Sequence, residues 1–165
     1  MAFPPRLPRL DRLTPHDWLL AGEALASLVW ASLAIAFLPF RKVAQTASRP
    51  AARPSANLEA GLPRRIRWAV DAWGRRVPWR AVCFQKGLAL HWMLRRRGVA
   101  SVLHYGVAKE GGAGLKAHVW VSVAGRPVIG GEEAGGFACL ATFPPQERGG
   151  SSQRPANTLS ADDFS

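Results

Sequence analysis

The 165-residue sequence has few of the residues that build several common kinds of site. Its two cysteines are too few for a disulfide framework or for a four-cysteine zinc site. Acidic residues number 11 against 22 lysines and arginines, which leaves a net charge of +11. No internal repeat is present, and the length suits a single domain. The excess of positive charge favours contact with an anionic partner, such as a nucleic acid, a lipid surface or an acidic peptide.

Residues 1–44 are predicted to form an extended arm followed by a hydrophobic helix. Thr14-Pro15-His16-Asp17 is a helix start, because threonine caps, proline suits the first turn and aspartate favours the positive end of the dipole. The uncharged stretch 24–39 is shorter than the roughly 20 residues that cross a bilayer. The helix is a cleaved signal peptide, a membrane-surface or partner-docking helix, or a helix packed on its own domain.

Composition divides the remainder of the chain. Residues 45–61 are rich in alanine, serine, arginine and proline without apolar periodicity, and we expect a linker there. Residues 62–145 carry the patterns of a compact domain. Residues 146–165 are polar, lack a core pattern and are predicted to be a disordered tail.

The compact part begins with two helices. Apolar residues lie 4, 7, 8, 11 and 15 positions after Leu62, which describes one helical stripe that ends near Val77. A second helix is predicted from about Val82 to Arg97, because basic residues fill its last turn and Gly98 follows it.

Strands follow the two helices. They are predicted at 99–107, 116–123, 126–129 and, as a short fourth strand, 137–143. A two-residue turn at 124–125 pairs Trp120 with Ile129 and His118 with Gly131. Helices followed by antiparallel strands predict an α+β fold.

Cys83 is a candidate nucleophile. It falls in the first turn of the second helix, where free backbone N–H groups and the positive dipole end favour a thiolate. Gly87 follows one turn later and permits close approach by a neighbouring strand. The alternative is a buried structural cysteine, which is also how we interpret Cys139.

His118 is a candidate base. On a strand, a histidine is usually structural, as we expect of His91 and His104. A thiol at a helix start and an imidazole on the sheet packed against that helix is, however, the arrangement in which a cysteine nucleophile meets its base.

The group that would orient the imidazole is expected opposite His118, where the sequence has Gly131 in place of a carboxylate. Either Glu132 or Glu133 reaches back to the ring if the strand bulges at the glycines. The alternative is a solvated acid in a turn.

Three sequence blocks carry a family resemblance over about Arg80 to Pro144. The blocks are RAVCFQKGLALHWMLRRRGVASVLHYGV, KAHVWVSVAGRPVIGGEE and FACLATF, and the first two are separated by a Gly-rich loop. Together they resemble the transglutaminase-like leader peptidases of lasso-peptide biosynthesis, the microcin-processing protein family. The apolar helix followed by LPFRKVA resembles the stand-alone form, which works with a separate leader-recognition protein.

The resemblance implies a papain/transglutaminase-like cysteine peptidase core, with helices packed on an antiparallel sheet, that removes the leader from a ribosomally made precursor through a thioester. It implies that Cys83 is the nucleophile and His118 the base, without metal or cofactor. Many members carry an aspartate near 130–131, and Glu132 is our substitute for it. Gln85 and Trp120 are candidate oxyanion or substrate contacts.

The implied partners are the precursor peptide, the recognition protein and an asparagine-synthetase-like cyclase that uses the freed amine. Two other functions stay open: an acyl-transferring enzyme with the same residues, and a basic binding protein without turnover. Nucleic acid is disfavoured because the arginines are dispersed. A reactive thiolate favours the cytoplasm, and the apolar helix allows peripheral membrane contact.

Overall fold

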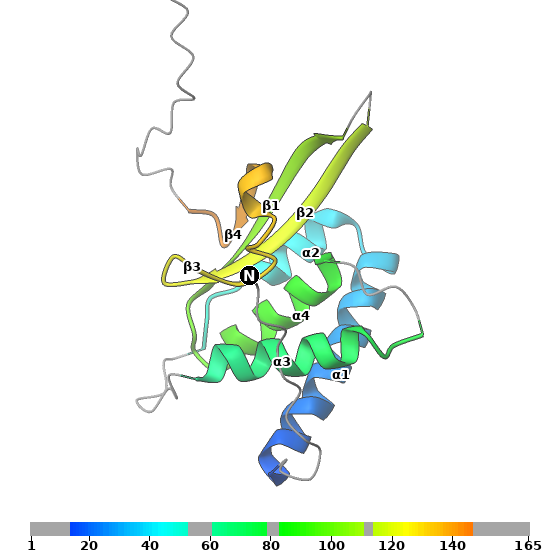
Figure 1. Ribbon diagram of the computed structural model, residues 1–165, viewed down its shortest axis with the longest axis vertical. Helices are drawn as coiled ribbons and strands as arrows, with labels where there is room; N and C mark the ends of the chain where they lie inside the picture. The colour runs from blue at the N-terminus through cyan, green and yellow to red at the C-terminus, as the bar shows by residue number, and fades with distance from the viewer. Residues whose placement is uncertain (1–13, 53–60, 79–82, 111–113, 147–165) are drawn as a thin grey trace, which may run out of the picture.

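The computed structural model describes residues 14–52, 61–78, 83–110 and 114–146. Over these ranges the chain has an α+β fold in which four helices pack on a four-stranded antiparallel sheet, as the sequence predicts. The helices gather on one side of the sheet, and the hairpin of its two longest strands extends beyond them (Figure 1). The predicted arm at 1–13, residues 53–60 of the predicted linker and almost all of the predicted tail lie outside the described residues.

Helix α1 (Pro15–Phe37) begins where the sequence predicts. The Thr14 hydroxyl accepts a hydrogen bond from the Asp17 N–H, and the Asp17 carboxylate accepts one from the Thr14 N–H at 3.0 Å. One side of the helix packs on the following helices and buries Leu20, Ala24 and Leu28 in the core. Helix α1 is thus packed on its own domain along one face.

Helix α2 (Phe40–Ala47) is an element that the sequence patterns did not predict. Its last turn uses residues 45–47, which were expected to start the linker. Val43 and Ala47 are one turn apart and both buried, and the Ala47 carbonyl oxygen lies 2.8 Å from Nε2 of His91. The tertiary contact therefore stabilises a helix that is too short to show a clear period by itself.

Helices α3 (Leu62–Gly74) and α4 (Cys83–Arg96) form the centre of the core. The first ends three residues before the predicted Val77, and the second matches its predicted bounds within one residue at each end. Their buried residues share one cluster with those of α1. This cluster includes Ile66, Val70, Leu88 and Leu94.

The sheet contains β1 (Ser101–Glu110), β2 (Gly114–Val123), β3 (Arg126–Ile129) and β4 (Ala138–Phe143), in the spatial order β3-β2-β1-β4. Strand β4 crosses back to pair with β1, which is the order of a Greek key. A 3-10 turn, Ala134–Gly136, precedes β4. Ala124 and Gly125 both have positive φ, 49° and 75°, as a tight two-residue hairpin turn requires, so the predicted turn is confirmed.

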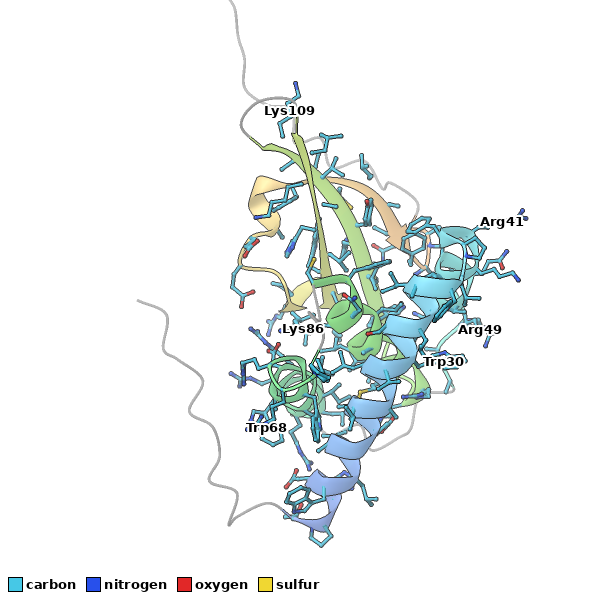
Figure 2. All side chains as sticks on the ribbon, turned by 90° about the vertical axis from the view of Figure 1, so that its right-hand side faces the viewer. Trp30, Arg41, Arg49, Trp68, Lys86 and Lys109 are labelled. Atoms are coloured by element: carbon cyan, nitrogen blue, oxygen red, sulfur yellow. The ribbon has the colours of Figure 1, made fainter. Side chains whose placement is uncertain are left out.

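The two faces of the sheet have different roles. Val119 and Val121 of β2 lie against Gly87 of α4, so their face is the one that the helices cover. Because side chains alternate along a strand, His118 and Trp120 project from the other face. Figure 2 shows α1 and α2 on the covered side and the turn before β4 on the other.

Candidate active site

Cys83 is the first residue of α4 and is half-buried. One turn later, Gly87 packs directly on β2: a Cβ atom there would lie 2.8 Å from Cγ1 of Val119. The lack of a side chain at Gly87 therefore lets α4 lie against the strand. Because Val119 directly follows His118, this contact sets the first half of α4 beside the part of β2 that carries the imidazole.

Cys83 and His118 belong to different sides of β2. His118 projects from the face opposite to α4, and β3 pairs with β2 only at residues 121–123. A contact between the Cys83 thiol and the His118 imidazole therefore has to form around the edge of β2, where the strand does not pair with β3. Among the described residues, Sγ of Cys83 has no hydrogen-bond partner, so the pair is not closed in this structure.

The His118 ring is buried and held by a main-chain atom. Its Nε2 lies 2.7 Å from the carbonyl oxygen of Gly130. A carbonyl only accepts, so Nε2 carries the proton, and in the neutral ring Nδ1 is the unprotonated nitrogen. Gly130 has φ +71°, and a Cβ there would lie 2.6 Å from the Val119 oxygen. Glycine is thus required at the position that supplies the carbonyl.

The predicted register between β2 and β3 is wrong by one residue. Ser122 pairs with Pro127 as a two-residue turn requires, but the register then shifts and Ile129 pairs with Val121 in place of Trp120. Proline has no N–H to donate, so the ladder breaks there and the extra residue forms a bulge. If the shifted register continued, Gly130 would pair with Trp120 and Glu132 with His118, but β3 ends at Ile129, and it is Nε2 of the His118 side chain that contacts the carbonyl oxygen of Gly130.

Glu132 was the predicted orienting carboxylate, and the structure places it against α3. Its Oε1 accepts a hydrogen bond from Nη2 of Arg67 at 2.8 Å, and the side chain is mostly exposed. A backbone hydrogen bond, the Arg67 hydrogen bond and charge, and the positive charge at His118 together lower the pKa of Glu132. Glu132 is therefore near enough to sense charge on His118, but the hydrogen bond to the imidazole comes from Gly130.

Four rings form a row on the open face of the sheet. Trp120 stacks between His104, at 5.1 Å between ring centroids, and His118, at 6.1 Å, while Phe137 lies 4.9 Å from His118 on the far side. Burial lowers the pKa of His104, whose Nε2 lies 2.8 Å from the Ser122 hydroxyl. The sequence predicted a site role for Trp120, whereas His104 was expected to be structural and Phe137 was not identified as a site residue. The signal for His104 was its place in the neighbouring strand.

This ring row borders a pocket of about 470 Å³. The pocket extends from Trp120 and His104 toward the bulged side of the sheet. Its lining includes Ser122, Pro127, Gly131 and Pro144. Trp120, predicted as a substrate contact, therefore lines a hollow next to His118.

Gln85 lies in the first turn of α4, and its Oε1 is buried with no hydrogen-bond partner among the residues that the structure describes. Nε1 of Trp68, on α3, is also buried and unpartnered. A buried polar atom that lacks a hydrogen-bond partner costs free energy. A bound group that reached either of these two atoms would therefore gain a hydrogen bond.

The remaining thiol and histidine were assigned structural roles. Cys139 was expected in the core, and this is wrong: it is exposed on β4. His91 is fully buried, with Nδ1 3.0 Å from the Ser101 hydroxyl, which confirms its structural role. In the part of the chain that the structure describes, no group of three or more His, Cys, Asp or Glu side chains is placed to hold a metal ion.

One known family matches most of the chain. The model of the transglutaminase-like superfamily matches residues 24–142, from within α1 into β4, and so includes both Cys83 and His118. No curated protein and no solved structure matches the chain. Because the family model covers well over half of the sequence, the chain belongs to the transglutaminase-like superfamily.

Proposed function

We propose that the protein is a cysteine peptidase that removes the leader from a lasso-peptide precursor. Members of the transglutaminase-like superfamily typically act as cysteine peptidases or acyltransferases. The observation that carries the proposal is the His118 ring, which is fixed through Nε2 with Nδ1 left as a base, on the strand against which the Cys83 helix packs. The finer assignment to leader removal rests on the resemblance of the sequence blocks around these two residues.

Proton transfer from the thiol to Nδ1 is the first step of this proposal. The step requires Sγ of Cys83 to reach the ring around the edge of β2, and catalytic hydrogen bonds of this kind often tighten only when substrate binds. The resulting thiolate gains stability from the positive end of α4 and from the imidazolium.

Peptide cleavage then proceeds in two halves. Sγ attacks the carbonyl carbon at the leader–core junction, and the free N–H of Cys83 donates a hydrogen bond to the developing oxyanion. The C–N bond breaks as Nδ1 of the imidazolium gives its proton to the departing amine, which leaves a thioester. Water gives a proton to Nδ1 and attacks the thioester, releasing the leader carboxylate and the thiol. The Gln85 amide, with its unpartnered oxygen, is the candidate for an additional substrate contact.

Substrate and partners follow from the same proposal. The pocket beside Trp120 would hold side chains next to the junction, and the net charge of +11 suits an acidic leader or recognition protein. The cyclase would use the amine that cleavage frees. Processing before export and a thiol that must stay reduced support a cytoplasmic location as part of this proposal.

Cleavage of a precursor peptide tests the proposal. The full chain is mixed with a lasso-peptide precursor and a leader-recognition protein, taken from the neighbouring genes where these encode them, and products are identified by mass. Cys83→Ala should abolish cleavage, whereas Cys139→Ala, the matched exposed thiol, should leave it unchanged. His118→Gln should lower turnover by about 100-fold or more and slow alkylation of Cys83 by iodoacetamide.

Product masses distinguish the other functions. A leader carboxylate formed by addition of water supports the peptidase. A leader joined to an added primary amine would instead show an acyltransferase. Precursor binding with no product from the wild-type chain, in the presence of the recognition protein, would contradict an enzymatic role and favour a binding protein.

A further inference from the structure

Helix α1 has a second apolar face that the domain does not cover. We propose that this outer face, together with an adjoining arginine pocket, docks on the surface of a bilayer that contains anionic lipids. The outer face is defined by the exposed large apolar residues of α1. They are Trp18, Leu19, Val29, Trp30, Leu33 and Phe37.

These residues share one side of the helix because their spacing follows the helical period. Phe37 is 79% exposed and Trp30 is 62% exposed, values that are unusual for apolar side chains of this size. The face extends along α1 from Trp18 to Phe37, a length of about 30 Å. A soluble domain rarely leaves so long an apolar strip uncovered, so we infer that another apolar phase covers it.

Both acidic residues of α1 are ion-paired with arginines of other helices. Asp17 is ion-paired with Arg65 of α3 at 2.6 Å, and Glu23 is ion-paired with Arg96 and Arg97 of α4. The outer face therefore carries no negative charge that an anionic surface would repel.

Basic residues border the end of the outer face. Arg41 and Lys42 are exposed on α2, and Arg49 is exposed just after it. In Figure 2, the side chains of Trp30, Arg41 and Arg49 project from the same outer side of α1 and α2, whereas Trp68 and Lys86 lie on the other side. Tryptophan beside cations is the pairing that suits the boundary between acyl chains and headgroups.

A pocket of about 400 Å³ joins the apolar strip to the cations. Trp30 and Trp92 supply apolar walls, and Arg49 and Arg95 supply positive charge, while Arg96, which also lines the pocket, is paired with Glu23. Arg95 donates to the carbonyl oxygens of Arg49 and Ser101, so no carboxylate neutralises it in the described structure. The pocket therefore fits the phosphate of one anionic lipid, with Trp30 at the level of the headgroups.

Peripheral docking explains the structure better than crossing of the membrane. Helix α1 is long and apolar enough to span a bilayer, but a third of its most apolar window is buried in the domain. Spanning would pull Leu28 and Ala31 out of the core and would separate Glu23 from its two arginines in a medium that solvates charge poorly. A helix lying in the interface keeps these contacts and buries only the outer face.

Vesicle binding by the full chain tests this proposal. We expect cosedimentation with phosphatidylcholine vesicles that hold about 30 mol% phosphatidylglycerol, and little with phosphatidylcholine alone, since each cation near the surface adds about fivefold to partitioning. Free inorganic phosphate should compete weakly. Carbonate at high pH should release the protein, because it is peripheral.

Variants assign the binding to the outer face. The double change Trp30→Ser, Phe37→Ser should weaken partitioning at least tenfold, whereas Leu115→Ser, a control that alters an apolar side chain with 73% exposure on β2, should not. Arg41→Gln with Arg49→Gln should weaken it by about 25-fold, and Lys109→Gln, at the far tip of β1, should have little effect (Figure 2). The unfolding midpoints of these surface variants should stay close to wild type.

Several results would overturn the proposal. They are equal binding to neutral vesicles, no loss of binding in the Trp30/Phe37 variant, and resistance to carbonate extraction. A dimer that Trp30→Ser dissociates would show that a second copy covers the face, and a complex with the recognition protein lost in the same variant would assign it to that partner.

Discussion

The Nε2 atom of His118 lies 2.7 Å from the main-chain oxygen of Gly130. A backbone dipole thus holds the ring where an orienting carboxylate was expected. A carbonyl fixes the tautomer and the ring plane as a carboxylate does, but it offers a partial charge in place of a full one. Orientation of the base therefore depends on the backbone conformation of one glycine.

Gly130→Ala should disturb this orientation. The substitution forces alanine to φ +71° and sets its Cβ 2.6 Å from the Val119 oxygen, so the backbone must move. We expect a loss of about 2–4 kcal/mol in the free energy of unfolding. The nitrogen chemical shifts of His118 should change toward a mixture of tautomers.

Gly125→Ala is the matched control for that change. It has a similar φ of +75° but no atom within 4 Å of the new Cβ, so only the backbone penalty of about 1 kcal/mol remains. Its His118 spectrum should match wild type. Equal losses of stability in the two variants would show that the Gly130 contact is unimportant.

The contact between α4 and β2 predicts stability changes of opposite sign for alanine substitutions at two other glycines. Gly87→Ala sets a Cβ 2.8 Å from Cγ1 of Val119, and the overpacking should cost about 1–3 kcal/mol of stability. Gly22→Ala, in an open part of α1, should stabilise by up to about 1 kcal/mol through helix propensity. Urea denaturation measures both.

Val119→Ala tests whether Cγ1 of Val119 is the atom that clashes with the new Cβ of Gly87→Ala. Alone it should destabilise by leaving a small cavity, but combined with Gly87→Ala it should cost less than the sum of the single changes, because the clash is gone. Strict additivity in this double-mutant cycle would mean that Gly87 is not packed on Val119.

Local signals explain which parts of the fold were predictable. The cap at Thr14 and the turn at 124–125 are determined by neighbours in sequence, and the structure confirms both. Helix α2 was missed because its stability comes from Val43, Ala47 and a hydrogen bond to His91 that is distant in sequence. Such contacts leave no periodic pattern in eight residues.

The site was predictable only in part. The positions of the thiol at a helix start and of the imidazole on β2 follow from local patterns. The partner of His118 did not, because it is a main-chain atom just past the end of β3. The bulge after Pro127, which breaks the predicted register, was not predicted either. Proline in the predicted strand was the available signal for that break.

Glu132→Gln should have a small effect on precursor cleavage. Its carboxylate pairs with Arg67, and the imidazole already has a partner in Gly130. We expect less than about a tenfold loss of turnover, from removal of a charge near His118. Glu133→Gln, its exposed neighbour, controls for net charge. A loss near 100-fold with an altered pH profile would instead assign Glu132 the orienting role that the sequence suggested.

His91 should make the fold sensitive to acid. Burial lowers the pKa of His91 from 6.5 to about 4, against the opposing hydrogen bond to the Ala47 carbonyl. Above pH 6.5 both folded and unfolded chains hold the ring neutral, so its contribution to stability is complete. As the pH falls toward 4, the unfolded chain takes up a proton that the folded chain refuses, and about 3 kcal/mol of stability is lost.

Denaturation of wild type and His91→Gln across pH 4 to 7 isolates this contribution. The variant loses hydrogen bonds and is less stable than wild type at pH 7. The difference in stability between the two proteins should shrink as the pH falls, because only wild type has the buried histidine whose proton uptake favours the unfolded chain. His16→Gln, a change at an exposed histidine, should give a curve parallel to wild type. A difference between wild type and His91→Gln that is constant with pH would mean that the ring takes up its proton equally in both states, and that the buried contacts to Ala47 and Ser101 do not hold it neutral.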